Sequence, residues 1–316
     1  MKIRTILVML WALLAANAVP AADSALQEDL NRQLREAATV DDVDDVRKLL
    51  AKGANVESAN EFGKTALMRA VESGGSKSAT VLLSKGANVN ARTVAGCTAL
   101  TFAAENGHAD ISAMLVELGA NVHDRTRAGW DALMISARLG YDVIVAQLLD
   151  FQADPNATDR YGDTALHGAA EKGHAKVIAV LLKHDAHPNQ PNRKGETAMM
   201  KAAEKGHADA IKLIAAKGAD ANLKDKNGDT ALHFAAAKGH AAAVQALLAA
   251  GANPNITDRA GSTPLMDAAE AGHDKVVKAL LDKGARTDVK DADGKTALQL
   301  AEGHKRDTVV KLLQGK

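Results

Sequence analysis

The apolar residues of this chain recur in short groups that predict short amphipathic helices. Val177 and Ile178 are followed four residues later by Leu181 and Leu182. Because residues three and four positions apart share one face of a helix, each such group marks a face that a helix buries. Other apolar segments contain alanine pairs, as at residues 169–170, whose small side chains let neighbouring helices approach closely.

A glycine motif divides the chain into equal units. The pattern Gly-x-Thr-Ala-Leu recurs every 33 residues without an insertion. Its glycines are Gly63, Gly96, Gly129, Gly162, Gly195, Gly228, Gly261 and Gly294. A fixed period of this length is typical of solenoids built from one repeated supersecondary unit.

Each unit predicts a turn followed by two helices. The leading glycine suits a turn with positive φ, and the threonine two residues later, such as Thr164, can cap the first helix. Asp131 replaces this threonine once, and Pro264 takes the first helical position once, where proline is tolerated. A second glycine, such as Gly173, ends the first helix, and a further glycine, such as Gly218, ends the second.

These features resemble the ankyrin repeat. The helix–turn–helix–hairpin units carry Thr-Ala-Leu-His at residues 164–167 and 230–233, and Gly-His at residues 173–174, 206–207, 239–240 and 272–273. The resemblance covers roughly residues 24–316 and implies an all-α ankyrin-repeat solenoid of about nine helix pairs joined by β-hairpin loops. The chain departs from the family pattern where methionine replaces histidine, at Met68, Met134, Met200 and Met266.

The N-terminal segment, residues 1–22, is predicted to be a signal peptide. Lys2 and Arg4 give it a positive start, and residues 6–16 form an apolar run that small residues follow. Eleven apolar residues are too few to span a bilayer, which takes ~20, so no membrane span is expected after cleavage. We expect the mature chain to begin between residues 19 and 23, and to lie in the periplasm or be secreted.

The remaining residues form three predicted parts. Residues 23–57 fit an N-terminal capping repeat, because their acidic surface suits a terminal unit with one polar face. Residues 58–290 contain seven internal repeats, and residues 291–316 form a C-terminal capping repeat.

Charge and composition exclude several classes of function. Lys plus Arg and Asp plus Glu each total 39, so no nucleic acid partner is expected. The single cysteine, Cys97, excludes a disulfide framework, and we expect a monomer in which Cys97 can form an intermolecular disulfide. The chain has no phosphate-binding loop, no His-Glu-x-x-His motif and no Gly-x-Ser-x-Gly elbow. We therefore expect a binding protein without cofactors rather than an enzyme.

Histidine follows the second glycine in five units. These residues are His108, His174, His207, His240 and His273. Their spacing places them at least ~10 Å apart, too far for one metal ion to bridge. The resemblance implies that they form hydrogen bonds between repeats. His184 and His187 are the one close pair, and since no further ligands lie nearby, no metal site is expected.

The hairpin tips differ between units in a way that predicts a binding surface. The resemblance implies that the tips and the first helices line a concave groove. Five successive units carry a base at one tip position, namely Arg127, Arg160, Arg193, Lys226 and Arg259. Acids accompany three of them, in the pairs Arg160/Asp163, Arg193/Glu196 and Lys226/Asp229. We expect these pairs to form local ion pairs, leaving Arg127 and Arg259 for a partner. The alternative is a polyanion-binding module that uses the whole row and binds with a steep salt dependence.

Aromatic residues sharpen this prediction. Phe62, Trp130 and Tyr161 fall on tip positions, where burial is not expected, and Phe102 begins a first helix. Exposed aromatics beside arginine are typical of binding hot spots. The predicted partner-binding residues are Trp130, Tyr161, Phe102, Phe62, Arg127, Arg138, Leu139, Arg160, Arg193 and Arg259. The alternative is that the irregular unit beginning at Gly129 has no partner.

We thus predict a protein–protein interaction module of the periplasm. Resemblance to exported bacterial ankyrin proteins implies an accessory role in stress defence or in neutralising a toxin. No residue of the chain distinguishes between these two roles.

Overall fold

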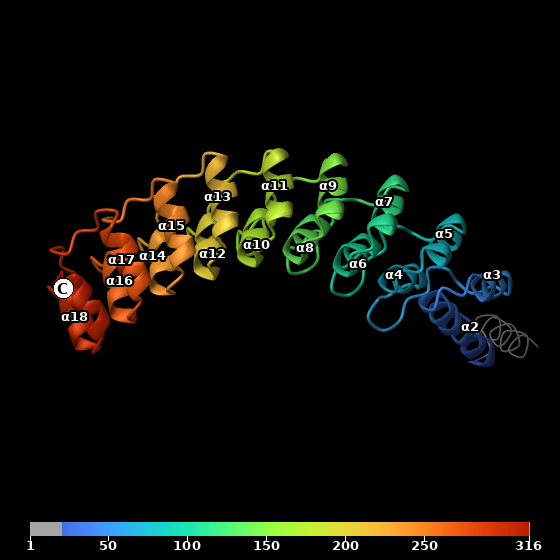
Figure 1. The fold of residues 1–316 in the computed structure, drawn as a ribbon. Helices are drawn as coiled ribbons and strands as arrows, with labels where there is room; N and C mark the ends of the chain where they lie inside the picture. Colours follow the sequence, from blue (N-terminus) through green and yellow to red (C-terminus); the bar gives the residue numbers. More distant parts are fainter. Residues whose placement is uncertain (1–20, 316) are drawn as a thin grey trace, which may run out of the picture. The chain divides into compact units, whose positions relative to one another are not determined.

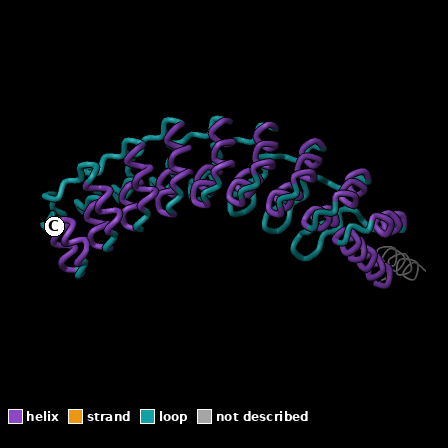
Figure 2. The backbone as a smooth tube through the Cα atoms, viewed as in Figure 1, coloured by secondary structure: helices purple, strands orange, loops and turns teal. Residues whose placement is uncertain are grey.

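The computed structural model describes residues 21–315, with side chains from residue 23 onward. In this range the chain consists of helices joined by loops (Figure 2). The predicted signal peptide, residues 1–22, lies outside the described residues except for its last two positions, which begin the first described helix. None of the helices between residues 21 and 315 has the length and apolar character needed to cross a bilayer.

The described residues form nine helix pairs, each with a first helix and a second helix (Figure 1). The first helices are α2 (Ala21–Thr39), α4 (Ala66–Glu72), α6 (Ala99–Asn106), α8 (Ala132–Leu139), α10 (Ala165–Lys172), α12 (Ala198–Lys205), α14 (Ala231–Ala237), α16 (Pro264–Ala271) and α18 (Ala297–Gly303). The second helices are α3 (Val43–Ala51), α5 (Ser76–Ser84), α7 (Ala109–Glu117), α9 (Asp142–Asp150), α11 (Ala175–Lys183), α13 (Ala208–Ala216), α15 (Ala241–Ala249), α17 (Asp274–Leu281) and α19 (Asp307–Leu313). This confirms the all-helical array that the sequence predicts.

The helix pairs divide between two compact units, one ending at Asn121 and the other beginning at Val122. In the first unit, α4 packs between α2 and α6, and α3 packs on α5. In the second unit, the first helices α8 to α18 form one layer in which each helix contacts the next, and the second helices α9 to α19 form another. Such nearest-neighbour packing is the rule in repeat proteins.

Local hydrogen bonds explain where the first helices begin and end. In α10, Oγ1 of Thr164 accepts the N–H of His167, and Nδ1 of His167 accepts the N–H of Thr164, which makes a capping box. Gly173 ends this helix with φ 73°, in the left-handed region that favours glycine. Asp131 caps α8 by accepting the N–H of Met134 at 2.9 Å, as its place in the motif predicts.

Small residues form the contact between first helices. Ala169 and Ala170 in α10, and Ala202 and Ala203 in α12, are fully buried. Because each side chain is a single methyl group, successive first helices lie close together. One leucine in most of the second helices, such as Leu181, is also fully buried. The short helices are therefore stabilised by their neighbours in the stack rather than by their own length.

The loop that joins each helix pair to the next forms a tight turn, which we call the tip. In one tip the N–H of Asp225 donates to the carbonyl of Asp229 at 2.9 Å. The Asp225 carboxylate accepts the backbone N–H groups of Asn227 and Asp229. Equivalent turns take the place of extended hairpins, since the described residues contain no strand and one isolated β-bridge, between Ala59 and Thr65.

Backbone hydrogen bonds join successive tips of the second unit. The donors and acceptors are Arg193 to Tyr161, Lys226 to Lys194, Arg259 to Asn227, and Ala292 to Ala260. This contact requires glycine, because a Cβ at Gly195, where φ is 84°, would lie 2.9 Å from the backbone nitrogen of Lys226. The repeat therefore fixes the spacing of the tips.

The recurring histidines join each repeat to the preceding one. Nε2–H of His207 donates to the carbonyl of Glu171 at 3.1 Å, and the ring covers Gly173 so closely that a Cβ there would clash with it. His108, His174, His240 and His273 form the equivalent hydrogen bond. Arg306 replaces histidine in the last pair and donates from Nε to the carbonyl of Glu270 at 3.0 Å. The predicted structural role of these histidines is confirmed.

Candidate partner-binding site

Two of the aromatic residues predicted to bind a partner belong to the first unit. Phe62 is exposed on its tip, as expected. Phe102, in α6, has an exposed fraction of only 6%, and Nζ of Lys64 lies 4.6 Å from the centre of its ring. Phe102 therefore offers little surface to a partner, contrary to the prediction, because its ring packs beneath a side chain from the preceding repeat.

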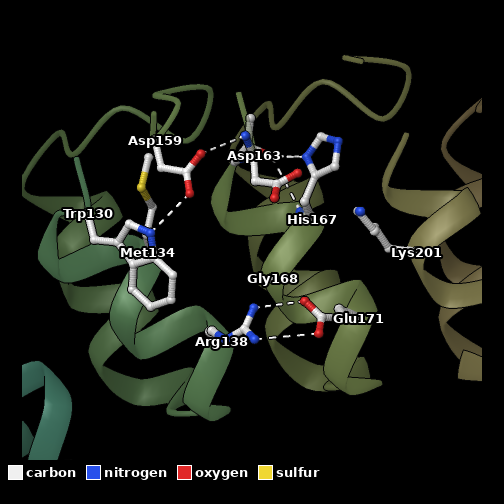
Figure 3. A pocket seen from close by; sticks show the side chains of 10 residues that line it. Trp130, Met134, Arg138, Asp159, Asp163, His167, Gly168, Glu171 and Lys201 are labelled. Carbon is white, nitrogen blue, oxygen red and sulfur yellow. Dashed lines mark hydrogen bonds and ion pairs between the residues drawn. The ribbon is translucent and has the colours of Figure 1, made fainter. Parts of the chain in front are cut away.

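Trp130 lies just before α8 and is partly buried, contrary to the expectation of an exposed ring. Its indole Nε1–H donates to Oδ2 of Asp159 at 3.0 Å (Figure 3). The other carboxylate oxygen of Asp159 accepts the backbone N–H groups of Tyr161 and Asp163. The buried carboxylate of Asp159 thus forms hydrogen bonds within its own tip and also with Trp130 of the preceding tip. Trp130 therefore connects two repeats.

Arg138, at the end of α8, is not free to pair with a partner. Its Nη1 lies 2.8 Å from Oε2 of Glu171 in α10, and its guanidinium lies 5.5 Å from the centre of the Trp130 ring. Burial alone would raise the pKa of Glu171, but the hydrogen bond and charge of Arg138 outweigh it and hold that pKa below its usual value. The predicted partner contact of Arg138 is therefore replaced by a contact within the chain.

A second polar network continues from α10 to α12. The ammonium group of Lys201 pairs with the carboxylate of Glu196. Nδ2 of Asn192 donates to Oδ1 of Asp163 and to Oε2 of Glu196, each at 2.8 Å. Burial would raise the pKa of Glu196, but the hydrogen bonds from Lys201 and Asn192 lower it below its usual value. These contacts occupy Asp163 and Glu196, two of the three acids that the sequence places beside the basic tips.

His167 lies between the two networks and is buried (Figure 3). Its Nε2–H donates to the carbonyl of Glu196 at 3.1 Å, while Nδ1 serves the cap of α10. Burial lowers the pKa of the imidazole, which favours the neutral form. The cavity among these side chains has a volume of about 30 Å³, which is room for one or two water molecules rather than for a ligand.

The basic residues of the tips remain without ionic partners. None of the three expected pairs, Arg160/Asp163, Arg193/Glu196 and Lys226/Asp229, forms a salt bridge in residues 21–315, so that expectation is wrong. Arg160 instead donates to the carbonyl of Arg127. The physical reason is that the acids turn toward the first helices, while the longer basic side chains extend into solvent.

The exposed side chains of these tips recur in successive repeats of the second unit. Tyr161 is the aromatic member of this set. Its exposed fraction is 65%, and it directly follows Arg160 in the sequence. We call this set the tip surface, and its members are Arg127, Arg160, Tyr161, Arg193, Lys226 and Arg259, all exposed. Leu139 is also exposed, at the C-terminal end of α8.

Two acids of the second unit, Asp229 and Asp267, have raised pKa values that the sequence analysis did not predict. Burial, together with the charges of Asp225 and Asp258, raises the pKa of Asp229 to about 6. Burial also raises the pKa of Asp267, in α16, to about 7, with Asp229 and Asp258 adding to the effect and a hydrogen bond from Ser262 opposing it. One feature of the sequence indicates the difference. Position 267 is an acid, whereas the equivalent position two repeats earlier is Lys201.

Within residues 21–315, no group of three or more His, Cys, Asp or Glu side chains is arranged to hold a metal ion.

A family model described as ankyrin repeats (3 copies) matches residues 34–126, 119–192, 185–258 and 242–316. These matches overlap and together extend over most of the chain. A comparison with curated proteins finds no match.

Proposed function

Because this chain belongs to the ankyrin-repeat family, whose repeats are protein–protein interaction modules, we propose that it binds a partner protein through the tip surface of its second unit. The observation that carries the proposal is that all five basic residues of the tip surface are exposed and form no salt bridge within residues 21–315. Exposed charge without an internal partner contributes little to folding and is available to a ligand.

Tyr161 supplies the apolar part of this surface. A large rigid ring left in water forgoes burial energy, and it loses little conformational entropy when a partner covers it. The backbone hydrogen bond from Arg193 to the carbonyl of Tyr161, at 2.9 Å, holds the tip that presents the ring. Trp130 acts beneath the surface, because its hydrogen bond to Asp159 joins two successive tips. Arg138 joins α8 to α10 through Glu171.

We further propose that the chain is exported to the periplasm and serves there as an accessory, in stress defence or by neutralising a toxin. Support for export comes from residues 1–22 alone, whose charge and apolar run fit a signal peptide. The intact mass of the protein from a periplasmic fraction tests it. A mass that begins at residue 19 to 23 supports export, and a mass that retains Met1 contradicts it.

Affinity capture from periplasmic extract tests the binding function. We expect a protein that the wild type retains and that Tyr161→Ala with Arg160→Gln releases. Lys176→Gln with Lys183→Gln provides a control that changes exposed charge on α11, away from the tips. Equal retention by both double variants contradicts the proposed surface.

A further inference from the structure

The tip cations form a row of single charges at the spacing of the repeat. Arg127, Arg160, Arg193, Lys226 and Arg259 stand at the same position of five successive repeats. Neighbouring repeats lie ~10 Å apart. Backbone hydrogen bonds connect the tips of Arg160, Arg193, Lys226 and Arg259, so the spacing of these four is a fixed property of the surface. The Arg160 side chain donates to the carbonyl of Arg127 and joins the fifth tip to them.

From this row we infer that the tip surface binds an extended acidic segment of the partner protein, in polyproline II conformation, with an acid at every third residue. This inference rests on the proposed function. A polyproline II helix has three residues per turn and rises ~3.1 Å per residue, so side chains on one of its faces repeat every ~9 Å. That period matches one repeat of the protein, and each acid therefore meets one basic tip.

Tyr161 gives the same segment a second kind of contact. Its ring is 65% exposed and stands beside Arg160, at the second of the five basic tips. Aromatic rings on protein surfaces are the usual platform for polyproline II ligands, since they stack on the flat faces of proline. The aromatic ring thus favours a proline-containing acidic segment over a segment that is only charged.

Charge density argues against a nucleic acid on this surface. Duplex DNA carries one negative charge per ~1.7 Å of its axis, whereas the tips offer one positive charge per ~10 Å. The chain as a whole has no net positive charge to attract a polyanion. A narrow ligand with widely spaced acids fits this row better than a nucleic acid does.

Fluorescence anisotropy with the purified full chain tests the inference. The probe is a labelled (Glu-Pro-Ser)5 peptide, and its control is a peptide of the same composition with the five glutamates in one block. We expect the spaced peptide to bind about 10-fold more tightly, because several weak charge contacts form together. Equal affinity for the two peptides, or tighter binding of an oligo-dT strand of equal charge, overturns the inference.

Variants identify the surface that the peptide uses. Arg160→Gln with Arg193→Gln and Lys226→Gln is expected to weaken binding of the spaced peptide about 10-fold. The matched control is Lys176→Gln with Lys183→Gln and Lys217→Gln, which removes three exposed charges outside the tips and should leave the affinity unchanged. Tyr161→Phe should retain binding and Tyr161→Ala should weaken it. Equal weakening by the two triple variants overturns the inference.

The two proposals fail in different ways. If the spaced peptide does not bind, while the tip variants still lose the captured partner, then the inference about ligand chemistry is wrong and the proposed function stands. If neither the peptide nor any captured protein depends on the tips, the proposed function fails as well. Unchanged melting of each variant, followed by circular dichroism, establishes that a loss of binding is not a loss of folding.

Discussion

The same two register positions carry a satisfied ion pair in α12 and unsatisfied acids in the next two repeats. Glu196 and Lys201 pair beside α12, whereas Asp229 occupies the place of Glu196 in the following repeat, where it forms no salt bridge within residues 21–315. One repeat further, Asp267 stands where Lys201 would be, and its nearest partner is the hydroxyl of Ser262 at 2.9 Å. The same repeat fold thus contains an ion pair at these positions in one described repeat and acids without a salt bridge in the next two.

The difference is visible in the acidities of the groups. The pKa of Glu196 lies below its usual value, because Lys201 and Asn192 outweigh the effect of burial. For Asp229 and Asp267 nothing outweighs burial and neighbouring negative charge, so their pKa values rise to about 6 and about 7. The repeat motif therefore determines the fold of each unit, while these variable positions determine its response to pH.

The largest expected effect is at Asp267. Its folded pKa lies above the usual 3.8, so the folded state holds the proton more tightly than the unfolded state. Ionising Asp267 therefore costs stability, and this cost is absent below pH 4 and fully present once the pH has risen through 7. Asp267→Asn should raise the unfolding free energy by up to about 4 kcal/mol at pH 8 and by little below pH 4. Urea titrations at both pH values measure this difference.

Asp282→Asn is the matched control, since Asp282 is exposed at the end of α17. As a substitution of an exposed residue, it should change the unfolding free energy by less than about 0.5 kcal/mol at either pH. A gain from Asp267→Asn that is the same at pH 4 and pH 8 would mean that the carboxylate is not strained by burial.

The second largest effect is expected at Trp130, whose ring lies beside the ion pair of Arg138 and Glu171. Trp130→Ala removes a partly buried ring and the hydrogen bond to Asp159, and should lower the unfolding free energy by about 2 kcal/mol. Trp130→Phe keeps the ring and should cost about 1 kcal/mol. Thermal unfolding of both variants measures these losses. An unchanged melting temperature for Trp130→Ala would restore the expectation of an exposed ring.

The fold was predictable from the sequence because its determinants are local and repeated. Glycines with positive φ, capping threonines and histidines that face the preceding repeat act within fixed sequence distances. The candidate site was predicted less well. Glu196 has Arg193 three residues before it and Lys201 five residues after it, and only side-chain geometry selects Lys201. Trp130 likewise depends on Asp159, a partner one repeat away.

The third effect tests the ion pair between α8 and α10. Arg138→Gln should lower the unfolding free energy by about 1 kcal/mol at pH 7, since both side chains are partly buried. The pKa of Glu171 is lowered in the folded state, so the pair stabilises the protein above the unfolded pKa of Glu171 and this contribution is lost as pH falls through its folded pKa. The loss should therefore vanish at pH values below the folded pKa of Glu171. A constant loss across pH would indicate packing rather than charge.

The smallest effect is expected at the tips, and it separates folding from binding. Arg160 and Lys226 are exposed and form no salt bridge in the described part of the chain, so Arg160→Gln with Lys226→Gln should change the unfolding free energy by less than about 0.5 kcal/mol. Lys201→Gln removes one charge from the paired network and should cost more than both together, because it leaves the carboxylate of Glu196 partly buried without its cation. Urea titrations of the three proteins at pH 7 compare these losses directly. If the tip variant loses as much unfolding free energy as Lys201→Gln, the basic row stabilises the repeats. Its charges are then not available to bind a partner.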